Sequence, residues 1–338
     1  MNRPLSLLIL SLVALVGIGP ARASNLNQQL NIHPHNATQG APRDAADQWM
    51  QLGDQSLAAG ELEQALQAWT KAADIYGLLG DSQGAGRAFS AMGTTYAQMG
   101  RFTEAENAFV RRVGIAADRS DPVGQALGLN NLGMLYFAEG QLVQAQSKFT
   151  EALEVAKPTG NPRAIGVSLN NLGLIATRQG DLTTAVTLLE SAANYRLLAG
   201  DVVGEANTSN NLGDVYVDLG RENNAIGAYR VGLRLGADGG DRSTQLRALD
   251  GLLGIYLERA DFVAMGTHLT QRLALTPFDT PTPDLQAAHS LRWLGDFHYA
   301  QGNIESAKQA YGQGLQVARA VGNKSLEAEL TNRLLLRG

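Results

Sequence analysis

Cysteine and a strong net charge are both missing from this sequence of 338 residues. The absence of cysteine excludes disulfide bonds and thiolate metal sites, so packing alone must stabilise the folded chain. The 27 basic and 32 acidic residues give a formal net charge of −5, without the basic clusters that nucleic-acid binding requires. No apolar run reaches the roughly 20 residues of a membrane-spanning helix. These absences exclude nucleic acid as a partner and predict no stable membrane insertion of the mature chain.

The first 23 residues have the pattern of an export signal. Arg3 precedes an apolar run, Leu5–Ile18, and Pro20 separates that run from the A-x-A sequence Ala21–Ala23. A charged start, a short apolar core and small residues at the cleavage position are typical of a signal peptide. We therefore expect an exported protein that is periplasmic, lumenal or secreted; a retained membrane anchor is the alternative. Because no cysteine follows the signal, a lipid anchor on an N-terminal cysteine is excluded.

Residues 24–43 are rich in Asn, Gln, His and Pro and predict a flexible leader, whereas residues 44–338 carry an internal repeat. A small residue, which we call the frame residue, recurs at a spacing of 40. The frame residues are Gly53, Gly93, Gly133, Gly173, Gly213, Leu253 and, after 42 positions, Gly295. A second set follows seven positions later: Gly60, Gly100, Gly140, Gly180, Gly220, Ala260 and Gly302. Self-similarity at a fixed period of this length indicates a stacked array of helical units.

The third copy shows what one unit is. Apolar residues at helical spacing in Leu129–Tyr136 predict a first helix, and Gly140 ends it because glycine tolerates the left-handed turn. The apolar spacing in Leu142–Ala152 predicts a second helix. We expect the frame glycine Gly133 and the alanine Ala145 to be small because the two helices cross closely there. In the sixth copy larger residues stand at these places, which predicts a helical pair with a looser crossing.

Glycine followed by Asp or Asn punctuates the copies, and the acid or amide is expected to cap the next helix. These pairs are Gly80-Asp81, Gly160-Asn161, Gly200-Asp201, Gly240-Asp241 and Gly322-Asn323. The sequence thus predicts an all-α array of about seven antiparallel helical pairs. Their ranges are near 44–80, 81–120, 121–160, 161–200, 201–240, 241–281 and 284–322. A lone helix at 324–336 is expected to cap the apolar end of the stack.

This pattern resembles the tetratricopeptide repeat family. The resemblance is carried by Leu-x-x-Leu-Gly-x-x-Tyr at Leu129–Tyr136, by the second glycine, by an alanine such as Ala145 and by the aromatic residue four later, Phe149. It covers residue 44 to the C-terminus. The long period is similar to the subgroup of kinesin light chains and of polarity adaptors with asparagine-rich grooves. The resemblance implies a right-handed superhelical solenoid that binds protein partners in a concave groove lined by the first helices.

The resemblance also places groove residues two and three positions before each frame residue. Asn-Asn-Leu-Gly stands there in three consecutive copies. The asparagines are Asn130, Asn170 and Asn210, with Asn131, Asn171 and Asn211 beside them. An asparagine amide both donates and accepts hydrogen bonds, so a row of them suits the backbone of an extended peptide. The alternative, which weighs most for the second of the two positions, is that the amides tie neighbouring repeats together.

The last copies have a different polar set at the groove positions: Asp250, Arg292 and Trp293. Trp and Arg are frequent anchors in protein interfaces, which makes these residues candidates for partner binding. The alternative is a solvated face in which Trp293 covers the end of the core. Neighbours of the frame, such as Met134, Leu174, Arg178 and Asp214, are expected to add selectivity.

The sequence contains no convincing motif for catalysis, phosphate binding or metal binding. Gly80–Gly84 matches G-x-S-x-G, but a nucleophile elbow needs a strand before it, and here a helix is predicted on both sides. No phosphate-binding loop is present, and the five histidines form no H-x-x-x-H pair. We expect no catalytic site, no metal and no cofactor.

The sequence therefore predicts a non-enzymatic scaffold that binds a partner protein or extended peptide in its groove. Two rival functions remain open at this point. One is a structural subunit that assembles through its end faces or convex surface. The other is an exported solenoid that binds small molecules or glycans.

Overall fold

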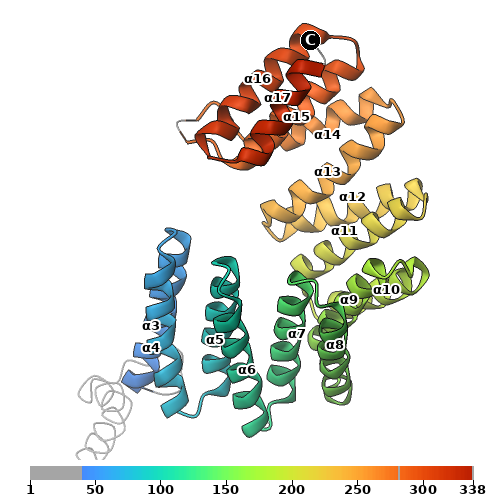
Figure 1. The fold of residues 1–338 in the computed structure, drawn as a ribbon. Coiled ribbons are helices and arrows are strands. Elements are labelled where there is room, and N and C mark those ends of the chain that lie inside the picture. The colour runs from blue at the N-terminus through green and yellow to red at the C-terminus, as the bar shows by residue number, and fades with distance from the viewer. Residues whose placement is uncertain (1–39, 281, 337–338) are drawn as a thin grey trace, which may run out of the picture. The chain divides into compact units, whose positions relative to one another are not determined.

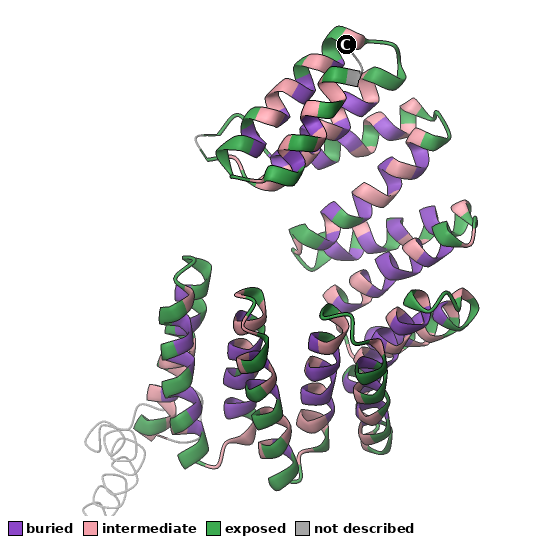
Figure 2. Cartoon of the chain, viewed as in Figure 1, coloured by how far each residue is buried: buried purple, intermediate pink, exposed green. Residues whose placement is uncertain are grey.

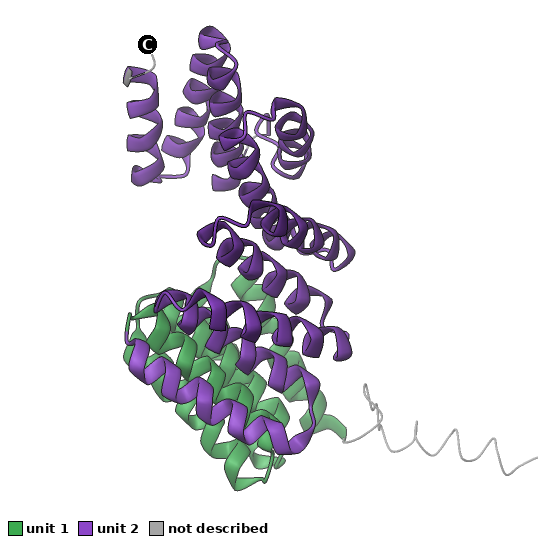
Figure 3. Cartoon of the chain, turned by 90° about the vertical axis from the view of Figure 1, so that its right-hand side faces the viewer, with its two compact units in different colours: residues 1–140 green, residues 141–338 purple. Residues whose placement is uncertain are grey.

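The computed structural model describes residues 40–280 and 282–336, and these residues form α-helices with one short 3-10 turn and no strand (Figure 1). The chain divides into two compact units, residues 1–140 and 141–338 (Figure 3). The signal peptide and the leader up to residue 39 lie outside the described residues. No helix in the described ranges is long and apolar enough to cross a membrane.

The described part of the first unit, residues 40–140, contains five helices in which chain neighbours pack on one another. They are α3 (Gly40–Ala58), α4 (Leu62–Leu78), α5 (Ser82–Gln98), α6 (Phe102–Asp118) and α7 (Pro122–Ala138). The second unit continues the alternation. Its helices are α8 (Leu142–Ala156), the 3-10 turn η1 (Lys157–Thr159), α9 (Pro162–Arg178), α10 (Leu182–Leu198), α11 (Val202–Asp218), α12 (Glu222–Asp238), α13 (Arg242–Glu258), α14 (Phe262–Leu275), α15 (Leu285–Ala300), α16 (Ile304–Ala320) and α17 (Lys324–Leu336). The predicted all-α succession of helical pairs and a final single helix is confirmed in the described part of the chain.

The start of α3 corrects the predicted leader boundary. The helix begins at Gly40, so residues 40–43 belong to the first pair and not to the leader. Arg43 explains the extra turn. Its guanidinium pairs with Asp47 at 3.5 Å and with Asp81, and it lies 5.0 Å from the centroid of the Tyr76 ring. A flexible leader could not hold a side chain between two helices in this way.

The helix caps confirm the meaning of the Gly-Asp and Gly-Asn pairs. In each of the five, the side chain accepts a hydrogen bond from the backbone N–H three residues later, at 2.7–3.1 Å. The capping residues are Asp81, Asn161, Asp201, Asp241 and Asn323. Each cap satisfies one of the backbone donors that a helix start leaves without a partner.

The frame position is occupied by glycine for a reason that the sequence alone did not indicate. A Cβ placed on Gly213 would lie 2.5 Å from the ring of Tyr229, and one on Gly93 would lie 2.4 Å from the ring of Phe109. The aromatic residue 16 positions after the frame, and not only the alanine 12 positions after it, therefore fills the space over the glycine. Phe109 and Tyr229 are 4% and 3% exposed, and buried positions recur in this way along the described helices (Figure 2).

An aspartate follows the frame glycine wherever that aromatic residue has a polar atom. Tyr229 Oη donates to Asp214 Oδ1 at 2.6 Å, and Tyr311 Oη donates to Asp296 Oδ1 at 2.7 Å. In the first pair Trp69 Nε1 donates to Asp54 at 3.1 Å. Asp214, which we expected to select partners, thus accepts a hydrogen bond from a buried core tyrosine of its own pair.

The crossing of the sixth pair is looser, as predicted: α13 and α14 approach each other closely over less of their length than α9 and α10 or α11 and α12 do. The core between them is filled all the same. Leu253 and Met265 are 0% exposed and Leu269 is 2% exposed, as deeply buried as their counterparts in other pairs. Leu253 is larger than the glycine at the frame position of other pairs, and Leu269 is smaller than their aromatic residue. The two changes compensate in volume, so the core of this pair stays filled.

Two turns hold a non-glycine residue in the left-handed region. Ala260 has φ +53°, where the equivalent Gly220 has φ +67°, and Ser120 has φ +54°. An L-residue in this conformation costs about 1–2 kcal/mol, partly offset because glycine has more freedom when unfolded. We expect Ala260→Gly to raise the free energy of unfolding by about 0.5–1 kcal/mol in chemical denaturation. The control Ala237→Gly, in the last turn of α12, should lower it by up to about 0.5 kcal/mol, because glycine costs less at a helix end than in its interior. Destabilisation by both changes would contradict the prediction.

Candidate binding site between helices α13 and α15

The first helices of the second unit, α9, α11, α13 and α15, are connected to one another by polar side chains. Asn170 of α9 is 7% exposed, and its Oδ1 accepts hydrogen bonds from Thr208 at 3.0 Å and from Asn211 at 2.9 Å, both on α11. Its Nδ2 donates to Asn171 at 3.2 Å. These amides join one helical pair to the next.

Asn210 makes the corresponding contact one pair later. It is 0% exposed, and its Nδ2 donates to the backbone carbonyl of Thr244 on α13 at 3.0 Å. Gly232 of α12 makes room for it, because a Cβ there would lie 2.1 Å from Asn210 Oδ1. That buried oxygen has no hydrogen-bond partner. The side chain is enclosed by its own pair and the next.

The first unit holds the remaining pair of asparagines. Asn130 is 2% exposed and its Nδ2 donates to the Ala126 carbonyl at 2.9 Å, while Asn131 is half-buried. The contacts of Asn170, Asn171, Asn210 and Asn211 correspond to the alternative in which the amides tie neighbouring repeats. A partner-facing role for the asparagines stays a prediction, and the structure places it on side chains that are mostly enclosed.

An open cavity of about 370 Å³ lies between α13 and α15, on the helices that begin the sixth and seventh pairs. It is lined by Arg242, Ser243, Leu246, Arg247, Asp250 and Gln286. The lining combines one apolar side chain with two basic, one acidic and two uncharged polar side chains. Most of the accessible lining is nevertheless apolar, and an apolar surface with a few polar groups is the usual composition of a binding site.

The two arginines at this cavity are positioned by ion pairs that leave them accessible. Arg242 donates to Asp284 at 2.6 Å and to the Leu275 carbonyl at 2.7 Å, and Arg247 pairs with Asp214. Both arginine side chains are 43% exposed, so each retains N–H groups that face solvent. The hydrogen bond from Arg242 is the main reason that the pKa of Asp284 lies below its usual value.

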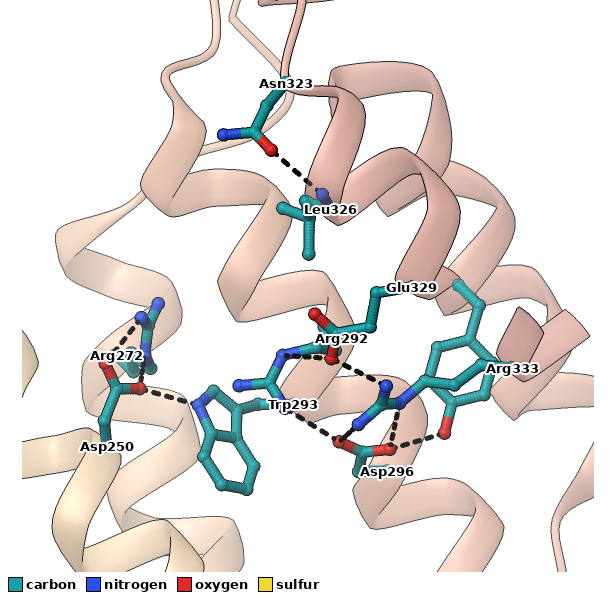
Figure 4. A network of polar contacts seen from close by, with 10 residues as sticks. Asp250, Arg272, Arg292, Trp293, Asp296, Asn323, Leu326, Glu329 and Arg333 are labelled. Atoms are coloured by element: carbon teal, nitrogen blue, oxygen red, sulfur yellow. Dashed lines mark hydrogen bonds and ion pairs between the residues drawn. The ribbon is translucent and has the colours of Figure 1, made fainter. Parts of the chain in front are cut away.

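Asp250 connects this cavity to the predicted arginine and tryptophan (Figure 4). Trp293 Nε1 donates to Asp250 Oδ1 at 2.6 Å, and the Arg292 guanidinium lies 4.5 Å from the centroid of the Trp293 ring. The structure therefore brings together the three predicted residues of the last copies. Trp293 is only 9% exposed and packs in the core of the second unit, as the alternative for this residue stated.

Arg272 is the residue that sequence reasoning missed. It is 1% exposed on α14 and binds both carboxylate oxygens of Asp250, at 2.7 and 3.1 Å. It also donates to the carbonyl and side-chain oxygens of Gln286, each at 3.2 Å, and to Ser290. The signal was its place 19 positions after the frame residue, where most copies have alanine or glycine.

A second polar cluster attaches α17 to α15 (Figure 4). Asp296, 5% exposed, accepts from Arg333 Nε at 3.0 Å and pairs with Arg292 at 3.3 Å. Glu329 of α17 also pairs with both arginines, at 2.6 and 3.7 Å. Beside this cluster, burial and then the positive charges of Arg292 and Arg272 lower the pKa of His289, so its ring is neutral at pH 7.

Catalytic arrangements are not found among the described residues. No group of three or more His, Asp or Glu side chains in these ranges could hold a metal ion. Ser82 of the G-x-S-x-G match is the first residue of α5 and follows the cap Asp81, so this stretch joins two helices and not a strand to a helix. The arrangement supports binding through hydrogen bonds and ion pairs.

Comparison with known proteins agrees with the repeat architecture. A family model described as tetratricopeptide repeat matches residues 124–197 and 164–238, and a second one matches residues 88–123. Residues 88–238 are tetratricopeptide repeats. A search of curated proteins found no match. Membership of the long-period subgroup stays a prediction.

Solved structures share the fold of this tetratricopeptide repeat protein at low identity. BtubC from P. vanneervenii matches with a TM-score of 0.57 at 18% identity, covering 66% of this chain and 92% of BtubC. The Rap conjugation gene regulator of plasmid pLS20, in complex with the Phr* peptide, gives 0.54 at 16% identity, with 82% and 76% covered. Aspartyl phosphate phosphatase F from Bacillus subtilis gives 0.55 at 15% identity, with 80% and 69% covered. At these identities the matches establish the fold alone.

Proposed function

We propose that this tetratricopeptide repeat protein is a non-enzymatic scaffold that binds a protein or extended peptide, and that the cavity between α13 and α15 is a main contact. The observation that carries the proposal is this cavity of about 370 Å³, lined by side chains that are fixed by neighbours yet open to solvent. Arg242 and Arg247 present donors, and Asp250, 39% exposed, presents acceptors. A backbone or polar side chain entering there finds groups that are already positioned, which reduces the ordering cost of binding.

The fold is compatible with such a role. The Rap regulator, with which this chain shares its fold, was solved in complex with the Phr* peptide. In the proposal the partner is not nucleic acid, because the chain has a net charge of −5. The proposal includes export through residues 1–23, so the partner belongs to a periplasmic, lumenal or extracellular compartment.

The test compares two variants in a crosslinking pull-down from the exported fraction. One variant, Arg247→Glu, reverses a charge at the cavity; the other replaces Asn130, Asn170 and Asn210 with alanine. Arg234→Glu is the matched control, because Arg234 also makes an exposed ion pair but lies on α12 away from the cavity lining. Circular dichroism establishes that each variant is folded.

We expect Arg247→Glu to lose the partner while remaining folded, and Arg234→Glu to retain it. The triple asparagine variant is expected to melt at a lower temperature, because its amides join neighbouring helices. A partner that is retained by folded Arg247→Glu would reject the cavity as the contact. A folded triple variant that alone loses the partner would assign binding to the asparagine row.

A further inference from the structure

Two arginines occupy the same place in different repeats. Arg112 of α6 and Arg272 of α14 each stand 19 positions after their frame residues, Gly93 and Leu253. The other copies have a small residue there: Ala72, Ala152, Ala192, Gly232 and Gly314. Each arginine reaches from its second helix toward the first helix of its own pair, where it donates to the residue 22 positions earlier: Ser90 for Arg112 and Asp250 for Arg272. The two sites can therefore be compared residue by residue.

The acceptors that surround Arg272 are missing around Arg112. Asp250, Gln286 and Ser290 bind Arg272. Each of these residues has a counterpart at the same distance before the frame residue of its own helix. The counterpart of Asp250 is Ser90 on α5, and the counterparts of Gln286 and Ser290 are Gly124 and Gly128 on α7. Two of these three have no side chain, and the third is shorter than aspartate. Arg112 thus occupies the position of Arg272, but the three corresponding positions around it supply no carboxylate and no amide side chain.

The consequence for Arg112 is a guanidinium with few partners. Its Nη1 donates to Ser90 Oγ, and its Nε is buried without a hydrogen-bond partner. No ion pair of Arg112 within 4 Å occurs in the described ranges, and burial lowers its pKa to about 10 although the negative charge of Asp121 opposes that shift. A Cβ on Gly128 would lie 2.8 Å from Val113 and 3.3 Å from the Arg112 side chain, so this side of Arg112 is packed, whereas one on Gly86 would lie 3.8 Å from Arg112. A buried cation without a hydrogen-bonded carboxylate is costly, and a charge-assisted hydrogen bond would relieve that cost.

We propose that the site at Ser90 and Arg112 binds an acidic side chain, aspartate or glutamate, of the partner, which takes the place that Asp250 has beside Arg272. This inference rests on the proposed scaffold function and names the chemistry of its ligand. The carboxylate enters beside half-buried Ser90, whose side chain is shorter than the aspartate that stands at this position beside Arg272. It accepts hydrogen bonds from the Arg112 guanidinium, as the Asp250 carboxylate does from Arg272. The site lies wholly in the first unit, separate from the cavity between α13 and α15.

The first measurement needs no partner. Ser90→Asp supplies the carboxylate from within the chain, at the same 22-residue separation as Asp250 and Arg272. We expect its melting temperature to rise by about 2–4 °C, and the rise to disappear in the Arg112→Met background. Thr94→Asp, one turn further along α5 on an exposed residue, adds the same charge and should not raise it. An unchanged or lower melting temperature for Ser90→Asp would overturn the proposal.

The second measurement selects random dodecapeptides by display on the wild-type protein and on Ser90→Asp. We expect the wild-type peptides to contain an aspartate or glutamate whose change to the amide weakens binding at least tenfold, and Ser90→Asp to bind them equally weakly. Peptides that bind both proteins alike, or that need no acid, overturn this inference but leave the scaffold function intact. If no peptide is selected by the folded wild-type protein, the peptide-binding function itself fails.

Discussion

Changing Asp250 to alanine is expected to lower the free energy of unfolding by about 3 kcal/mol, because it leaves the guanidinium of Arg272 buried without its carboxylate. Arg272 is 1% exposed, and Asp250 accepts two of its hydrogen bonds and a third from Trp293. The expected value is at the lower end for a broken buried pair, since the Asp250 side chain is 39% exposed and the other acceptors of Arg272 remain. Urea unfolding followed by circular dichroism measures it.

The matched control for this change is Arg247→Ala, on the same helix. Arg247 pairs with Asp214, and both side chains are more than 40% exposed. An exposed pair contributes little, so its loss should cost less than about 1 kcal/mol. The double variant Asp250→Ala/Arg272→Met should recover most of the stability lost in Asp250→Ala, because it removes the unpaired charge. Equal losses in Asp250→Ala and Arg247→Ala would refute the role given to the buried arginine.

Changing Gly213 to valine is expected to cost about 3 kcal/mol. Its Cβ would lie 2.5 Å from the Tyr229 ring, and the ring cannot yield freely because Tyr229 Oη is held by Asp214 at 2.6 Å. Overpacking of a filled core is relieved only by moving side chains off their rotamers or by separating helices α11 and α12. The loss is measured by thermal and chemical unfolding.

Gly227→Ala in α12 separates this steric effect from the general effect of replacing a helical glycine. Nothing lies within 4 Å of a Cβ at Gly227. Alanine there should raise the free energy of unfolding by about 0.5–1 kcal/mol, because it favours the helix and meets no neighbour. If Gly213→Val and Gly227→Ala shift stability in the same direction, the packing of Tyr229 over the frame position is not what requires glycine.

Local features of the fold followed closely from the sequence. The apolar spacing predicted where the helices lie, and the glycines predicted where the turns lie, because helices and turns both depend on interactions within a few residues of the chain. The caps at Asp81 and Asn161 could be predicted for the same reason, since a cap bonds only three residues ahead. The start of α3 at Gly40 was missed because Arg43 is held by Asp81 of the next pair, a contact that no local pattern encodes.

The candidate site was less predictable. Asp250, Arg292 and Trp293 were recognised from groove positions that the family resemblance implied, and they do lie together. Arg272 was not, because a charged residue 22 positions from its partner looks, in sequence, like any other polar residue of a solvated helix face. Its burial depends on the exact distance between α13, α14 and α15.

By itself the sequence determined the repeat, the helical pairs and the family, because a 40-residue period forces each unit to bury the same apolar face against its neighbours. Only the tertiary structure decided what the polar residues do. Asn170 and Asn210 are buried between first helices, while Arg242 and Arg247 remain open at a cavity. The physical reason is that the fate of a polar group depends on whether water or a neighbouring helix surrounds it. That surrounding is set by residues one repeat away, such as Thr208 for Asn170 and Asp214 for Arg247.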